Sequence, residues 1–86
     1  AYTRDWYEIT VENSGQVQIQ IEFEHASGDL DLEVRDADSG QVYAVSRGEE
    51  NVESVDFFLA NPRTLTIGID GFDEAANAYR LSWVLP

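Results

Sequence analysis

In the segment 27–35, residues 29–35 alternate strictly between polar and apolar side chains. Leu30, Leu32 and Val34 point to one side of an extended chain, and the charged residues between them point to the other. This period of two is typical of a half-buried β-strand that has one face in a hydrophobic core and one in water. Other apolar segments repeat the pattern, so it predicts the architecture of the whole chain.

Further segments predict strands and are separated by turn residues. They are 5–11, 17–23, 41–46, 52–59, 65–69 and 79–85. The turn 12–15 ends in Gly15, which can adopt a positive φ, and the turn 36–40 consists of residues that fold back onto their own backbone. Seven short strands without a helical period predict an all-β fold, either an antiparallel sandwich or a partly closed barrel.

The alternation also predicts which side chains face the core. The inward sets are Tyr7, Ile9 and Val11; Val17, Ile19, Ile21 and Phe23; Leu30, Leu32 and Val34; Val55, Phe57 and Leu59; and Leu65, Ile67 and Ile69, while Tyr79, Leu81, Trp83 and Leu85 close the domain. In the segment 41–46 the facing stays open. One register turns Val42 and Ala44 inward. The other register turns Tyr43 and Val45 inward.

The outward positions carry aromatic side chains that are candidates for a binding face. These are Trp6, Tyr43 and Phe58 on strands and Phe72 on the loop 71–77. Exposed aromatic rings on a flat sheet suit the binding of extended polymers, because they offer a large contact area at a low cost in conformational entropy. The alternative is that these rings pack under linkers, loops or other domains of a longer protein.

The chain is short and strongly acidic, and both properties limit its function. Residues 1–86 suffice for a single small domain, and the absence of cysteine excludes disulfides. A net charge of −12 argues against nucleic acid and anionic membranes as partners, because both require a basic surface. No run of about 18 apolar residues is present to span a membrane. The chain starts at Ala1 rather than at methionine, which suggests a piece excised from a longer polypeptide.

The sequence offers no catalytic constellation. Its lone histidine, His25, lies in a polar loop, and Ser27 two residues away lacks a third group that would orient a nucleophile–base pair. Carboxylate pairs such as Asp29 and Asp31 are expected by chance among 17 acidic residues. We therefore expect a protein that is not an enzyme.

Calcium is the cofactor that the acidic clusters leave open, since a hard cation is bound by carboxylate oxygens. The clusters are Asp29 with Asp31, Asp36 with Asp38, and Asp70 with Asp73 and Glu74. The second fails the twelve-residue calcium-loop pattern, because Gly40 stands at its fifth position and Arg47 at its twelfth. The structural alternative is a solvated strand face for the first cluster and an Asp-rich turn for the second.

Several motifs follow one another in a recognisable order. They are Asp5-Trp6-Tyr7-x-Ile9-x-Val11; Gly15 followed by Val17-x-Ile19-x-Ile21; Gly28-Asp29-Leu30-Asp31-Leu32; and Leu65-x-Ile67-x-Ile69-x-Gly71 followed by Asn77-x-Tyr79-x-Leu81. In this order they resemble the bacterial pre-peptidase C-terminal domain, and the last of them is similar to its final hairpin. The collagen-binding domains of clostridial collagenases have a similar pattern.

The resemblance implies a jelly-roll-like β-sandwich of about seven to eight strands and a non-catalytic module, usually at the C-terminal end of a secreted protease. In calcium-binding relatives, acids ahead of the first aromatic pair are ligands, and only Asp5 matches here because Tyr2 replaces another acid. We therefore expect no tight calcium site. Asp5 is the first candidate ligand, and Asp29 and Asp31 are alternatives. Collagen-binding relatives use tyrosines on later strands, which the segment 67–71 lacks.

The expected function is that of a secreted accessory domain of a peptidase or another hydrolase. It would target the parent enzyme to its substrate, or support the folding and stability of the parent. We expect a monomer that contacts the parent peptidase domain, and an insoluble polymer or protein substrate, through outward aromatic and acidic side chains. The alternative is a structural spacer or a calcium-responsive adhesion module that contacts only its own parent chain.

Overall fold

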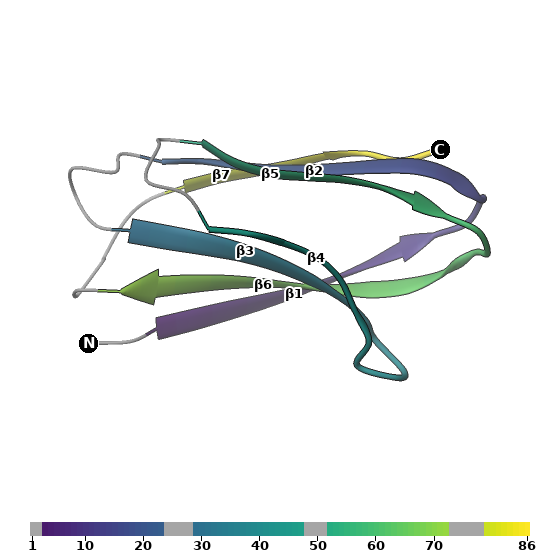
Figure 1. Cartoon of the computed structure of the whole chain (residues 1–86), viewed down its shortest axis with the longest axis horizontal. Helices are drawn as coiled ribbons and strands as arrows, with labels where there is room; N and C mark the ends of the chain where they lie inside the picture. The colour runs from purple at the N-terminus through teal and green to yellow at the C-terminus, as the bar shows by residue number, and fades with distance from the viewer. Residues whose placement is uncertain (1–2, 24–28, 48–51, 73–78) are drawn as a thin grey trace.

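The computed structural model describes residues 3–23, 29–47, 52–72 and 79–86. These residues form antiparallel β-strands, and no described segment is helical (Figure 1). The strands are β1 (Thr3–Val11), β2 (Gly15–Phe23), β3 (Asp29–Asp36), β4 (Val42–Ser46), β5 (Val52–Leu59), β6 (Arg63–Phe72) and β7 (Tyr79–Val84). No helix in the described part of the chain has the length and hydrophobicity to cross a membrane. His25 and Ser27 lie outside the described residues.

The strands form two sheets that lie one above the other (Figure 1). One sheet has the order β1-β6-β3-β4 and the other has the order β5-β2-β7. Apart from the step from β3 to β4, each strand is followed along the chain by a strand of the opposite sheet. This interleaving confirms the prediction of an all-β, antiparallel, jelly-roll-like sandwich.

The core lies between the two sheets and consists of the side chains that alternation turns inward. The buried hydrophobic residues are Val11, Val17, Ile19, Ile21, Phe23, Leu30, Leu32, Val34, Val55, Leu59, Leu65, Ile67 and Ile69. Ile9 and Phe57 are partly buried against them. The inward sets predicted for β2, β3 and β6 are therefore confirmed, because a strand that faces the opposite sheet buries every second residue.

The turn after β3 is built as the sequence predicts. The Asp36 carboxylate accepts hydrogen bonds from the backbone N–H groups of Asp38 and Ser39, at 2.8 and 3.0 Å. Gly40 has φ of 77°, which a residue without Cβ adopts freely. Gly15 has φ of 142°, and a Cβ there would lie 2.6 Å from the Pro86 side chain, so glycine also permits the close approach of the C-terminus.

Some predicted boundaries were wrong. β1 begins at Thr3, two residues before the predicted start of the first strand, and β6 extends through Phe72, which was expected on a loop. The motifs at 65–71 and 77–81 do not form a hairpin, since β6 and β7 belong to different sheets. Pairing with β1 on one side and β3 on the other extends β6, and sequence pattern alone does not reveal such pairing.

Candidate functional site

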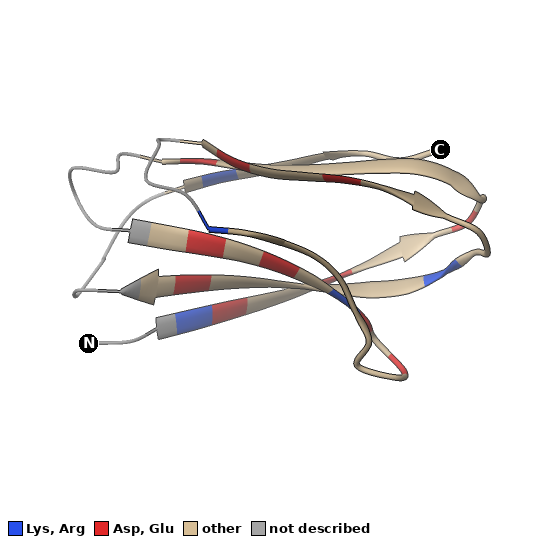
Figure 2. Ribbon diagram, viewed as in Figure 1, with Lys and Arg blue, Asp and Glu red and all other residues tan. Residues whose placement is uncertain are grey.

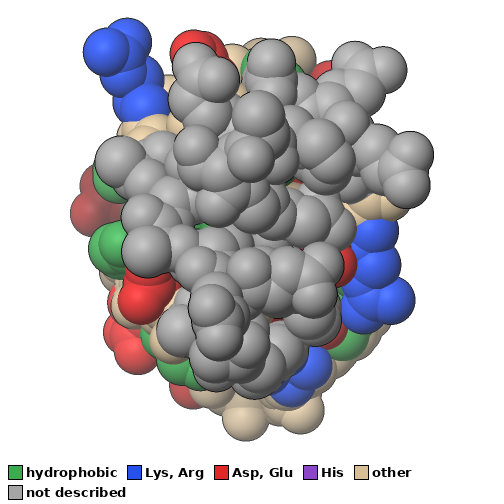
Figure 3. Space-filling view, turned by 90° about the vertical axis from the view of Figure 1, so that its left-hand side faces the viewer, with side chains coloured by type: hydrophobic (Ala, Val, Ile, Leu, Met, Phe, Trp, Pro, Cys, Tyr) green, Lys and Arg blue, Asp and Glu red, His purple; other side chains and the backbone are tan. Residues whose placement is uncertain are grey.

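The sandwich has two outer faces, which differ in how their polar side chains are used. We call the outer side of the sheet β1-β6-β3-β4 the four-stranded face and the outer side of the sheet β5-β2-β7 the three-stranded face. Charged residues are most frequent on β1 and β3, whereas β2 and β7 are uncharged over most of their length (Figure 2). Around the undescribed segments at one end of the sandwich, acidic and arginine side chains both reach the surface (Figure 3).

Trp6 lies on the four-stranded face, as predicted, but it is engaged by its neighbours. It pairs in register with Gly68 on β6, and its indole ring occupies the space above that glycine. The guanidinium groups of Arg4 and Arg35 lie 4.9 and 5.8 Å from its ring centroid, within the range of cation–π attraction. The ring is 45% exposed, because neighbouring side chains cover part of it.

The charges of the four-stranded face are largely satisfied within the face itself. Arg4 forms a two-pronged ion pair with Asp70 on the next strand, with an Nη2–Oδ2 distance of 2.9 Å. Arg35 donates to both carboxylate oxygens of Glu33, at 3.0 and 3.1 Å. Such pairs leave few donors and acceptors for a ligand.

The three-stranded face carries amide and hydroxyl groups in cross-strand rows. The register places Asp56, Gln18 and Val84 side by side in one row, and Ser54, Gln20 and Ser82 in the next. The outer rows hold Phe58 beside Gln16, and Val52 beside Glu22 and Arg80. Because strands lie about 4.8 Å apart and every second residue shares a face, the rows form a grid spaced about 7 Å along the strands.

Asp56 organises the amides of this face. Gln18 donates from Nε2 to its Oδ2 at 3.2 Å, and Gln16 donates to its Oδ1. These two hydrogen bonds, with that from Gln16 the stronger, lower the pKa of Asp56 below its usual value, so this carboxylate stays ionised at neutral pH. Within the described part of the chain, the hydroxyls of Ser54 and Ser82 have no hydrogen-bond partner.

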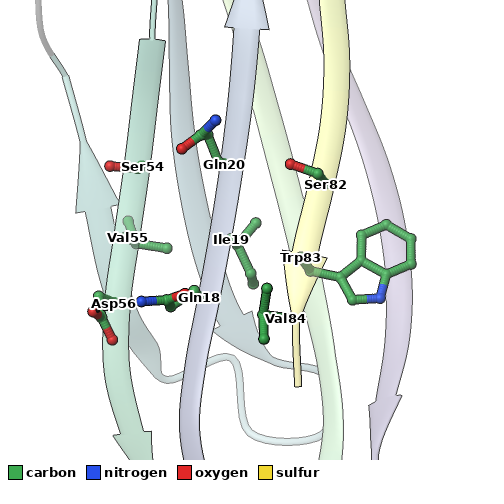
Figure 4. Close-up of a pocket in the computed structure, with 9 residues that line it drawn as sticks. All are labelled: Gln18, Ile19, Gln20, Ser54, Val55, Asp56, Ser82, Trp83 and Val84. Atoms are coloured by element: carbon green, nitrogen blue, oxygen red, sulfur yellow. Dashed lines mark hydrogen bonds between the residues drawn. The ribbon is translucent and has the colours of Figure 1, made fainter. Parts of the chain in front are cut away.

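A hollow of about 250 Å³ lies at the centre of the three-stranded face (Figure 4). Its polar lining is Gln18, Gln20, Ser54, Asp56 and Ser82, contributed by all three strands. Val84 lines the same hollow and is exposed. The arrangement offers an uncharged polar surface with one fixed carboxylate.

The aromatic residues predicted to form a binding face do not lie together. Phe58 projects from the three-stranded face and is 67% exposed, whereas Trp6 lies on the opposite side of the sandwich. Phe72 lies at the end of β6, and its side chain is outside the described residues. No single face therefore unites Trp6 and Phe58, and their roles in binding stay predictions.

Tyr43 does not project outward, and the expectation of an exposed ring was wrong. Val34 pairs with Ala44 and Arg35 pairs with Val42, so Tyr43 is the extra residue of a β-bulge. Its ring stacks on Phe57 with centroids 5.5 Å apart. The bulge interrupts the alternation, so Tyr43 and Ala44 both pack against the core.

The hydroxyl of Tyr43 joins a polar cluster at the end of β3. Arg63 donates to Asp36 Oδ2 at 2.6 Å and to the Tyr43 oxygen at 2.7 Å. The hydrogen bond from the Ser39 backbone N–H has the largest effect on Asp36, and the hydrogen bond from the Arg63 side chain the next largest. Together with smaller contributions they lower the pKa of Asp36 to about 2. The same ion pair raises the pKa of Arg63. This cluster stabilises the turn after β3. Because protein donors occupy the Asp36 carboxylate, the structure does not support the candidate metal site at Asp36 and Asp38.

The other candidate metal ligands are also engaged by protein groups. Asp5 accepts a hydrogen bond from the Tyr79 hydroxyl at 2.8 Å, and Tyr79 also contacts the Tyr7 hydroxyl. Burial, followed by these two hydrogen bonds, raises the pKa of Tyr79. Asp31 lies 4.0 Å from Arg47 Nε, and the Asp29 side chain is outside the described residues.

Calcium therefore does not fit the residues that the structure describes. Among them, no three histidine, cysteine, aspartate or glutamate side chains come close enough together to hold a metal ion. Asp73 and Glu74, which belong to the third acidic cluster, lie outside the described residues. A hard cation requires several oxygen ligands at one point, and the carboxylates of Asp5, Asp31 and Asp36 each lie against a protein donor instead.

Sequence analysis missed the three-stranded face as a site. The alternation of Gln18 and Gln20 with buried residues already places amides on the outer side of β2. However, Ser54 and Ser82 become their neighbours only through the pairing of β2 with β5 and β7. Alternation therefore predicts the facing of these side chains, and only the register assembles them into a surface.

Comparison with known proteins agrees with this fold. A family model described as "Bacterial pre-peptidase C-terminal domain" matches residues 3–71. The pre-peptidase C-terminal domain of collagenase from Bacillus anthracis superposes with a TM-score of 0.78 at 18% sequence identity, over 94% of this chain and 76% of that chain. Comparison with curated proteins yields no match. Domains of this family are non-catalytic accessory domains, typically at the C-terminus of secreted bacterial peptidases.

Proposed function

The chain belongs to the bacterial pre-peptidase C-terminal domain family, and on that premise we propose that it is an accessory domain that targets a secreted peptidase to an insoluble polymer. The domain would act outside the cell, together with its parent enzyme. It would contribute binding and no catalytic group. The observation that carries this proposal is the hollow of the three-stranded face, where the hydroxyls of Ser54 and Ser82 have no hydrogen-bond partner within the described part of the chain.

A targeting domain needs side chains that are free to contact a ligand. On the four-stranded face, Arg4 pairs with Asp70 and Arg35 pairs with Glu33, and both guanidinium groups also lie near the ring of Trp6. The three-stranded face keeps unpaired hydroxyls within the described part of the chain and an open hollow. Since a ligand gains little from groups that are already paired, the three-stranded face is the better binding surface.

Phe58 supplies the apolar contact that a flat polar face otherwise lacks. Its ring lies in the row next to Asp56, and most of its surface faces solvent. A large exposed ring at the rim of a polar hollow is typical of the few side chains that dominate the energy of binding. Phe58 is therefore the aromatic residue that we assign to targeting.

Co-sedimentation tests the proposal directly. The purified chain is mixed with collagen fibrils, chitin or cellulose, each with calcium and with chelator, and the pellet is analysed. We expect retention on at least one polymer and no effect of the chelator. No pellet under any of these conditions would contradict the targeting role.

A second candidate function is contact with the parent chain, and one observation favours it. At the open side of the sandwich, between the edge strands β1 and β7, Tyr7 is 41% exposed and Trp83 is 46% exposed. Both lie in the inward alternation, beside Ile9 and Leu81. Apolar side chains that the domain itself leaves partly uncovered suit an interface between domains.

Hydrogen exchange separates the two functions. Amide exchange of β1 and β7 is compared between the chain alone and the chain joined to its parent. If the domain packs against the parent, the amides of these edge strands exchange more slowly in the joined protein. If it serves targeting alone, their exchange stays unchanged.

A further inference from the structure

The middle of the three-stranded face carries groups that both donate and accept hydrogen bonds, on Gln16, Gln18, Gln20, Ser54 and Ser82. A glutamine amide offers N–H donors and a carbonyl acceptor, and a serine hydroxyl does both. Gln16 and Gln18 each use an amide donor on Asp56, and Gln20 uses one on Glu22 Oε1 at 2.9 Å, so the carbonyl oxygens of these amides remain for a ligand. Such a surface matches a ligand that carries hydroxyl groups along its whole length.

The charge of the molecule restricts that ligand further. The chain has a net charge of −12, so an anionic polymer would be repelled. On the three-stranded face Glu22 pairs in register with Arg80, so these opposite charges lie side by side. Asp56 is then the carboxylate at the centre of an otherwise uncharged surface. A neutral ligand avoids the repulsion that an anionic polymer would meet here.

The shape of the face argues against a peptide. Extended peptides bind by adding a strand to a sheet edge or by placing side chains in apolar pockets. Here the rows run across β5, β2 and β7, and the hollow is lined by amides, hydroxyls and a carboxylate together with the apolar residues Ile19, Val55, Trp83 and Val84, without a deep apolar pocket for a peptide side chain. Four rows at about 7 Å give a track about 20 Å long, which accommodates several sugar rings.

Phe58 lies at one end of this track. One face of a pyranose ring presents C–H groups, and these pack on an aromatic ring, while the equatorial hydroxyls reach polar groups alongside. Phe58 is followed along the track by Asp56 and Gln18, then by Ser54, Gln20 and Ser82. An aromatic platform beside a row of amides and hydroxyls fits a chain of sugars.

We propose that the three-stranded face binds a neutral, extended polysaccharide, with Phe58 stacking on a sugar ring and the Gln18 and Gln20 rows bonding to sugar hydroxyls. This proposal rests on the proposed function and names the substrate class of that site. Flat β-linked chains, such as cellulose and chitin, share the required chemistry. Chitin differs from cellulose in its N-acetyl group, which one of the glutamine amides of this face can also contact.

The glutamine side chains provide a direct measurement. The chain has four glutamines, of which Gln16, Gln18 and Gln20 lie on the face and Gln41 lies in the turn before β4. Cellohexaose or chitohexaose is titrated into labelled protein, and the side-chain amide resonances are followed by NMR. We expect shifts at the first three glutamines, and Gln41 serves as the internal reference.

Variants then link the face to retention on the insoluble polymer. F58A combined with Q18A should weaken retention on cellulose or chitin about tenfold, since an aromatic contact and a hydrogen bond are lost. W6A on the opposite face and Q41A in the turn are the matched controls and should change retention less than twofold. Thermal melting of each variant verifies that it is folded.

The outcomes separate this inference from the proposed function. Retention on collagen without retention on cellulose or chitin would overturn the polysaccharide assignment and leave targeting in place. Sugar-induced shifts confined to the four-stranded face, or equal losses in W6A and in the double variant, would also overturn it. No retention on any polymer, together with no NMR shifts, would overturn both.

Discussion

The two outer faces of the sandwich come from the same strand alternation and yet have different chemistry. On the four-stranded face, arginines from neighbouring strands bind acidic residues and flank Trp6. On the three-stranded face, amides and hydroxyls surround Asp56 and a hollow. The comparison teaches that the outward position of a side chain does not make it available for binding. What matters is whether a neighbour already satisfies it.

The distribution of arginine explains much of this difference. Four of the five arginines, Arg4, Arg35, Arg47 and Arg63, pair with acids of the four-stranded sheet. Arg80 is the arginine of the three-stranded face. A guanidinium group can bind a carboxylate with two hydrogen bonds. On the four-stranded face, arginines therefore occupy carboxylates that would otherwise be available to a ligand.

The largest expected difference between the two sheets is in how a carboxylate of each contributes to stability at acidic pH. The pKa of Asp36 in the four-stranded sheet is lowered from 3.8 to about 2, so the unfolded chain takes up the proton first as the pH falls. The ionised carboxylate therefore stabilises the fold above about pH 4, and this stabilisation is lost as the pH falls through 2. Urea unfolding between pH 7 and pH 2 measures the loss.

The matched variants of this experiment are D36N and D56N. D36N should be less stable than the wild type at pH 7 and should lose less stability between pH 4 and pH 2. D56N removes an exposed carboxylate whose pKa is also lowered, by Gln16 and Gln18, so it should reduce the acid-induced loss in the same direction but by less than D36N. Equal behaviour of the two variants would show that the Asp36 cluster has no special role.

A bulky residue at Gly68 should damage the four-stranded face. A Cβ at this position would lie 2.8 Å from the ring of Trp6, so Gly68→Val must displace the indole from its place between two guanidinium groups. We expect a loss of about 1–3 kcal/mol in the free energy of unfolding, as for other overpacked sites. Ser54→Val on the three-stranded face is the control, and a comparable loss there would refute the comparison.

The two exposed aromatic residues should respond differently to truncation. Trp6→Ala removes the ring that covers Gly68 and the cation–π contacts, at a cost of about 1 kcal/mol in stability. Phe58→Ala should stay within about 0.5 kcal/mol of the wild type, since most of its ring faces solvent. Urea titration measures the free energy of unfolding of both variants. A large loss of stability in Phe58→Ala would show that the ring of Phe58 supports the fold.

The smallest expected effect concerns the link between the sheets. Tyr79→Phe removes the hydrogen bonds to Asp5 and Tyr7 while it keeps the aromatic ring. A partly exposed hydrogen bond contributes about 0.5–1 kcal/mol, so the melting temperature should fall by a few degrees. Tyr79→Phe should leave polymer retention unchanged, because neither outer face is altered.

Much of the fold follows from local pattern. The inward sets of β2, β3 and β6 were predicted from alternation because burial between two sheets selects every second residue. The turn at Asp36 was predicted because its side chain bonds to the backbone two and three residues ahead. Such features depend on residues that are close in the sequence.

The candidate site was predicted only in part, for the opposite reason. Phe58 was correctly placed on an outer surface, but its neighbours come from β2, whose register no local pattern specifies. Tyr43 was misplaced because a bulge depends on the partner strand as well as on its own sequence. Trp6 was correctly turned outward, but Gly68, which lies beneath it, is 62 residues further along the chain.

The sequence by itself thus determined the strand class, the core-facing residues of β2, β3 and β6 and the local turn at Asp36, because these depend on periodicity and on short-range hydrogen bonds; Tyr7 and Trp83, which alternation turned inward on β1 and β7, are instead 41% and 46% exposed. The tertiary structure decided which outward side chains become neighbours. It turned one face into a layer of ion pairs and left the other as a grid of amides and hydroxyls, because strand order and register bring together residues that are distant in the chain.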